Sequence, residues 1–67
     1  MMKTISVNRE IYSIETIYKT IDVYKNYADI SFELNDLDVK LFFDKCRYDE
    51  LLTVKEFENY MIGLENT

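Results

Sequence analysis

Histidine, proline and tryptophan are absent from this chain of 67 residues, and cysteine and glycine occur once each, as Cys46 and Gly63. Without histidine, neither a Cys/His nor a Ser/His/Asp catalytic group can form within the chain, and a zinc site would need an unusual set of ligands. A single cysteine also excludes an intrachain disulfide. We therefore expect no catalytic residue, no cofactor, no metal site and no enzyme activity.

The one cysteine, Cys46, stands between Lys45 and Arg47. Neighbouring positive charges lower the pKa of a thiol and favour the reactive thiolate. A free cysteine more commonly serves as a small, partly buried apolar side chain. We interpret Cys46 as such a structural residue, with the reactive thiol as the alternative.

Basic charge is scarce, because 8 Lys and Arg residues stand against 13 Asp and Glu residues and leave a net charge of −5. Affinity for nucleic acid comes mainly from Lys and Arg, so we expect no nucleic-acid partner. No apolar run approaches the roughly 20 residues that span a bilayer, and the start of the chain lacks the apolar core of a signal peptide. The sequence predicts a cytoplasmic protein that does not associate with membranes.

Apolar side chains, in contrast, are plentiful: 48% of the residues are hydrophobic and 15% are aromatic. This content is too high for an intrinsically disordered segment. Because a chain of this length buries only a small core, its stability is expected to be marginal or to depend on a partner. We expect one small domain that spans residues 1–67.

Apolar and polar residues alternate on both sides of a short polar break within residues 30–43. The apolar positions are Ile30, Phe32, Leu34, Val39, Leu41 and Phe43. This pattern predicts a β-hairpin with one buried face and a turn at Asn35 and Asp36. Residues 3–8 alternate in the same way and predict a further strand. The opposite face of the sheet then carries Thr4, Ser6, Ser31, Glu33, Lys40 and Phe42.

A first helix is predicted to begin after Ser13, whose hydroxyl can accept a hydrogen bond from an amide of the first turn. At 100° per residue, one stripe of this helix is apolar and predicts a core-facing side. The members of that stripe are Ile14, Ile17, Tyr18, Ile21, Tyr24 and Ala28. A second strip, neither core nor charged, holds Thr16, Thr20, Val23 and Tyr27, and we interpret it as tolerated surface or as a contact for another chain.

A second helix is predicted to begin near Val54, because Thr53 and Glu56 have the spacing of a capping box. Its inward stripe comprises Val54, Phe57, Tyr60, Met61 and Leu64. Ile62 falls on the outer side, where the monomer does not explain an exposed apolar residue.

These elements give the order β-α-β-β-α. We expect an α+β two-layer sandwich in which two helices cover one face of a small mixed three-stranded sheet, with the first and second strands parallel. Open sheet edges would remain, and a peptide or a second copy of the chain can add to such an edge as a strand. A homodimer is therefore one expected assembly.

Two motifs carry a resemblance to a known family: the string from Ile11 to Glu15, which contains Tyr12-Ser13 before the first helix, and the string from Glu56 to Tyr60 in the last helix. Together with the hairpin between them, they resemble the small HxsD-type proteins of the His-Xaa-Ser system, over about residues 7–65. Gly63 stands where that family tends to have a basic residue.

The resemblance implies a non-catalytic accessory or peptide-binding module that works beside radical-SAM maturases of a small ribosomally made peptide. This chain lacks the three cysteines that hold the cluster of such an enzyme. Its partner would be a protein or peptide, and the candidate contact residues are the apolar ones outside the core: Val23, Tyr27, Phe42 and Ile62.

Two alternatives belong to other functional classes. A small acidic inhibitor would occupy a basic, nucleic-acid-binding site on a target protein, although the carboxylates are spread along the sequence. A minimal enzyme would use paired carboxylates such as Asp36 and Asp38. Those two residues also suit a hairpin turn, which is the interpretation we prefer.

Overall fold

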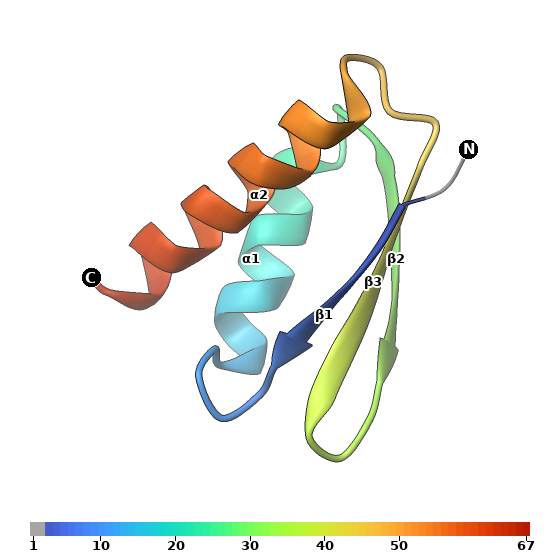
Figure 1. Cartoon of the computed structure of the whole chain (residues 1–67). Coiled ribbons are helices and arrows are strands. Elements are labelled where there is room, and N and C mark those ends of the chain that lie inside the picture. The colour runs from blue at the N-terminus through green and yellow to red at the C-terminus, as the bar shows by residue number, and fades with distance from the viewer. Residues whose placement is uncertain (1–2) are drawn as a thin grey trace.

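The computed structural model describes residues 3–67, which form three strands and two helices (Figure 1). In chain order these are β1 (Lys3–Asn8), α1 (Ile14–Tyr24), β2 (Asp29–Leu34), β3 (Asp38–Asp44) and α2 (Glu50–Glu65). Both helices lie on one side of the sheet. The predicted α+β fold with the order β-α-β-β-α is therefore confirmed.

The sheet differs from the prediction in its pairing, because its strand order is β1-β3-β2 and both neighbouring pairs are antiparallel. β1 and β2 run in the same direction, as a β-α-β connection predicts, but β3 is inserted between them. The expected mixed sheet is thus corrected to an antiparallel one. The physical reason is that the central position covers both edges of the most apolar strand.

The hydrophobic core is built on β3. Val39, Leu41 and Phe43 have 0% exposed surface, and Phe57 of α2 meets the ring of Phe43 edge to face at 5.0 Å. Ile17 of α1 is likewise fully buried. Both helices therefore converge on the same strand.

Helix α1 begins as predicted, since the Ser13 hydroxyl accepts from the Thr16 amide at 3.2 Å. Its buried side is wider than the predicted stripe. Thr16 and Thr20, which the sequence placed on a surface strip, are buried, and the Thr20 hydroxyl donates to the Thr16 carbonyl at 2.8 Å. Tyr18, which the sequence placed in the core, is 41% exposed.

Helix α2 begins at Glu50, one turn before the predicted start near Val54. Asp49 is the N-cap, and its carboxylate accepts from the Leu52 amide at 2.9 Å. The predicted capping box is replaced, because Thr53 instead donates to the Asp49 carbonyl at 2.8 Å and is buried. The first turn gave no periodic signal because Leu51 and Leu52 are both exposed.

Asparagine side chains shape the turns, as expected for a chain without proline. The Asn8 Oδ1 accepts from the Glu10 amide at 2.7 Å, and the Asn35 amide group donates to the Asp38 carboxylate at 2.9 Å. Lys45, directly after β3, has a φ of 51° in the left-handed region that favours glycine. The scarcity of glycine therefore leaves local strain at this loop.

Replacing Asp49 with alanine removes the acceptor for the Leu52 amide, and we expect the free energy of unfolding to fall by about 1 kcal/mol. Glu56→Ala removes a member of the box predicted from the sequence, and its effect is expected to stay within about 0.5 kcal/mol. Urea denaturation followed by circular dichroism measures both. A larger loss for Glu56→Ala than for Asp49→Ala would contradict this start of α2.

Candidate functional site: two open sheet edges

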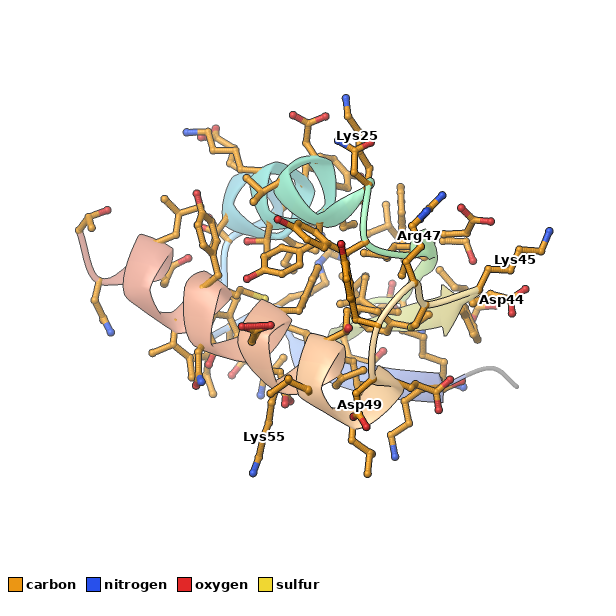
Figure 2. All side chains as sticks on the ribbon, turned by 90° about the horizontal axis from the view of Figure 1, so that it is seen from above. Lys25, Asp44, Lys45, Arg47, Asp49 and Lys55 are labelled. Carbon is orange, nitrogen blue, oxygen red and sulfur yellow. The ribbon has the colours of Figure 1, made fainter. Side chains whose placement is uncertain are left out.

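The central position of β3 leaves β1 and β2 with one unpaired side each. Each open edge has its own helix. Tyr18 of α1 packs against Phe32 of β2 with tilted rings whose centroids are 5.2 Å apart, whereas α2 shares a cavity with β1. Figure 2 shows Lys25, at the end of α1, and Lys55, on α2, pointing away on opposite sides of the molecule. The two edges are therefore separate surfaces.

A cavity of about 500 Å³ lies between β1, the loop after it and α2, and we call it the β1–α2 groove. Its walls combine apolar and charged side chains. Ile11 and Ile62, both on the wall, are 61% and 43% exposed. Lys55 and Glu58 bring both signs of charge to the same wall. The groove can thus accept an apolar side chain flanked by polar groups.

The backbone of β1 is free at Ser6, which lines one end of this groove, and at Thr4 before it. The Arg9 amide donates to the Leu37 carbonyl at 3.0 Å, which continues the register of β1 and β3. In an antiparallel ladder the direction of the peptide groups alternates, so those of Thr4 and Ser6 point toward the open edge. The Asn8 carbonyl already accepts from Ile11 and Tyr12, so the free stretch ends at Ser6.

The edge of β2 is more apolar. Phe32 is the register partner of Leu41 and shares its face, yet Phe32 and Leu34 are 43% and 47% exposed, because α1 covers this edge only in part. The prediction of a buried Phe32 and Leu34 is corrected accordingly. A shallow pocket of about 310 Å³ adjoins Phe32, with walls from Tyr18 and Ile21. We call Ile30, Phe32, Leu34 and Tyr18 the β2 edge surface.

The backbone groups of β2 follow the same alternation. The Asn35 amide donates to the Asp38 carbonyl at 2.9 Å, so the odd-numbered residues of β2 point their peptide groups toward β3. Those of Ile30, Phe32 and Leu34 point toward the open edge. The exposed Phe32 and Leu34 and the partly buried Ile30 thus also carry the backbone groups that face the open edge.

The four contact residues predicted from the sequence are not brought together. Ile62 lies in the β1–α2 groove, whereas Phe42 is half-buried on the opposite face of the sheet, where its register partners are Thr4 and Ser31. Val23 and Tyr27 are 42% and 43% exposed on and just after α1.

Among the residues of the two edges, Ile11, Phe32 and Leu34 are exposed apolar residues that the sequence did not indicate as contact candidates. The alternating pattern identifies Phe32 and Leu34 as strand residues. It does not indicate whether their strand lies at the edge or the centre of the sheet.

Tyr27 belongs to a row of aromatic rings that continues along both helices. Its ring lies 5.8 Å from Tyr48 and 5.4 Å from Tyr24, and Tyr24 lies 5.9 Å from Tyr60. The Tyr24 hydroxyl donates to the Glu56 carbonyl at 3.2 Å. Burial, followed by the charge of Glu56, raises the pKa of Tyr24. This row ties the end of α1 to α2.

Cys46 is partly buried after β3 and packs against the core. Burial, followed by the charges of Glu50 and Asp44, raises the pKa of the thiol. A raised pKa keeps the thiol protonated, which favours the structural interpretation over the reactive one. Within residues 3–67, no three Cys, Asp or Glu side chains are grouped closely enough to hold a metal ion.

The chain matches no model of a known protein family, no curated protein and no solved structure. The resemblance to the HxsD-type proteins therefore rests on the residues quoted for it and stays a prediction. In the part of the chain that the structure describes, neither helix has the length and apolar character needed to cross a bilayer.

One charged contact joins the end of α2 to the start of α1. The Glu65 carboxylate, at the end of α2, accepts from the Ser13 amide at 3.0 Å. The Ser13 amide, followed by the Thr16 and Ser13 hydroxyls, lowers the pKa of Glu65. The negative charge also lies at the positive end of the α1 dipole. Glu65 thus fastens α2 to the start of α1.

Because the pKa of Glu65 is lower in the folded protein than its ordinary value of 4.5, its contribution to stability is present above that pH and disappears as the pH falls through the folded-state pKa. We expect Glu65→Gln to lower the free energy of unfolding at neutral pH and to converge with the wild type in acid.

Glu58→Gln is the matched control, since it removes a carboxylate from the same helix and no hydrogen bond to α1. Urea denaturation at a series of pH values measures the difference between each variant and the wild type. A difference for Glu65→Gln that is the same at every pH would refute the role of the carboxylate charge.

Proposed function

We propose that this chain is a non-catalytic module that binds an extended peptide in the β1–α2 groove, where the peptide adds to β1 as a further strand. One observation carries the proposal: Ser6, whose N–H and C=O groups point toward the open edge, lines a cavity of about 500 Å³ that β1 shares with α2, and Thr4 continues the same edge. A strand edge beside a helix suits strand addition, in which main-chain hydrogen bonds give affinity and alternate side chains give specificity.

The walls of the groove define the peptide that it fits. Side chains of an added strand alternate between the two faces of the sheet, so every second one faces α2. Ile11 and Ile62 offer apolar contacts to such a side chain, and Lys55 and Glu58 offer charges of both signs nearby. The expected ligand is an extended segment with an apolar residue between polar ones.

The resemblance to HxsD-type proteins supports a particular setting for this module. In that setting the chain is an accessory protein that presents a ribosomally made peptide to a radical-SAM maturase. The gene should then lie beside a radical-SAM gene and a gene for a short precursor peptide. A genomic neighbourhood without both would remove this setting but not the peptide-binding groove.

A library of short random peptides displayed on phage, selected against the ¹⁵N-labelled protein, tests the groove. We expect selected peptides to shift the amide resonances of residues 3–8 and 55–62 in nuclear magnetic resonance spectra. Ile62→Lys places a charge on the apolar wall, and we expect roughly a tenfold or greater loss of affinity.

Leu52→Lys is the matched control, because Leu52 is an exposed apolar residue of the same helix, outside the groove. Selected peptides that bind Ile62→Lys as tightly as the wild type would disprove the proposed site. Binding that weakens steeply with salt and does not depend on Ile62 would instead support the alternative of a small acidic inhibitor.

A further inference from the structure

The β2 edge surface is complementary to itself, and we propose that it pairs with the same surface of a second copy of this chain. The two β2 strands run antiparallel, with Phe32 on the two-fold axis. The two sheets then join into one continuous sheet. This interface lies on the edge opposite the β1–α2 groove and does not depend on peptide binding.

The register follows from the side chains. A two-fold axis perpendicular to the sheet keeps each face on its own side, so residues that pair must share a face. With Phe32 opposite Phe32 of the second copy, Ile30 stands opposite Leu34. The exposed Phe32 and Leu34 and the partly buried Ile30 then all meet apolar partners. On the other face Ser31 stands opposite Glu33, a pairing that allows a hydrogen bond.

The neighbouring registers bring like charges together. A shift in one direction places Asp29 opposite Glu33 twice, and a shift in the other places Glu33 opposite Glu33. Like charges directly opposite one another destabilise a strand pair. The arrangement centred on Phe32 avoids both, so the charge pattern selects one register among the neighbouring ones.

The backbone supports the same arrangement. Ile30, Phe32 and Leu34 point their N–H and C=O groups away from β3, as the alternation from the Asn35–Asp38 hydrogen bond requires. In the proposed register these three residues face one another across the axis. Each pair can exchange two hydrogen bonds, so the interface satisfies groups that the monomer leaves to water.

A charge contact lies at each end of this interface. With Ile30 opposite Leu34 of the second copy, the start of each β2, which follows Lys25, lies beside the turn after the other copy's β2, which carries Asp36. The Lys25 side chain is 65% exposed and points away from the molecule (Figure 2). Its ion pair with Asp22 is exposed, so Lys25 is available to a second carboxylate. The two-fold axis produces this contact twice.

The β1 edge is less suited to self-pairing. Its free stretch ends at Ser6, because the Asn8 carbonyl is already bonded within the chain. A register centred on Ile5 would place Lys3 opposite Val7, a charge against an apolar side chain, and the peptide groups of Ile5 itself point toward β3. We therefore assign the dimer interface to the β2 edge.

Sedimentation equilibrium over a range of protein concentrations tests the dimer. We expect the wild type to dimerise. Phe32→Lys should raise the dissociation constant of the dimer by roughly a hundredfold or more, because two like charges meet at the axis. Leu52→Lys, at an exposed apolar residue away from both edges, should dimerise like the wild type. Circular dichroism checks that each variant folds. A wild type that stays monomeric at millimolar concentration would overturn the proposal.

Charge reversal tests the register. Lys25→Glu and Asp36→Lys should each weaken the dimer by roughly tenfold, because each creates two repulsive contacts. An equimolar mixture of the two variants restores both attractive contacts in the heterodimer, so the mixture should associate about as tightly as the wild type. A mixture no tighter than either variant alone would reject this register.

Discussion

Val39, Leu41 and Phe43, the inward side chains of β3, have no exposed surface, and the rest of the structure depends on their burial. Each contributes on the order of 1.5–3 kcal/mol when removed from water. β1 and β2 satisfy the backbone of this strand on both sides, and the helices cover its apolar face through residues such as Ile17 and Phe57. The two helices cover the centre of the sheet more completely than its edges, so apolar surface remains exposed at the β2 edge.

The sequence predicts the elements well where the signal is local. The alternation in the hairpin and the Ser13 cap involve residues close in the chain, so spacing alone locates the strands and the start of α1. Strand order is not local. Phe32 and Leu41 belong to the same alternating pattern and share a face, yet one is 43% exposed and the other 0%, because β2 lies at an edge and β3 at the centre. Periodicity predicts the face of the sheet on which a side chain lies, but not how deeply that side chain is buried.

The start of α2 illustrates a second limit. Asp49 and Thr53 are both good caps, and the sequence favours Thr53 because a matching Glu56 follows it. The turn between the two caps faces water through Leu51 and Leu52, so its apolar residues give no sign of burial. Two suitable caps one turn apart are distinguished only by how the helix docks.

The candidate site was predictable only in part, because the exposure of its residues also depends on how the helices pack. Thr16, Thr20, Val23 and Tyr27 form one strip in the sequence, but the structure buries the first two and exposes the last two. Helix α2 crosses α1 along the line from Thr16 to Tyr24, where Glu65 reaches Ser13 and Phe57 and Tyr60 meet Tyr24. The sequence did indicate Ile62, because an apolar residue on the polar side of an amphipathic helix departs from the pattern. The structure has Ile62 43% exposed.

The two open edges have a joint consequence for binding. If β2 pairs with its copy, β1 becomes the outermost strand at both ends of the continuous sheet, and both β1–α2 grooves remain open. The two β1 strands are then separated by five strand spacings of about 4.8 Å, or roughly 24 Å across the sheet. A partner that presents two peptide segments over that span gains affinity from simultaneous binding without any new contact. Under the proposed pairing, a small module with one groove would thus become a bivalent one.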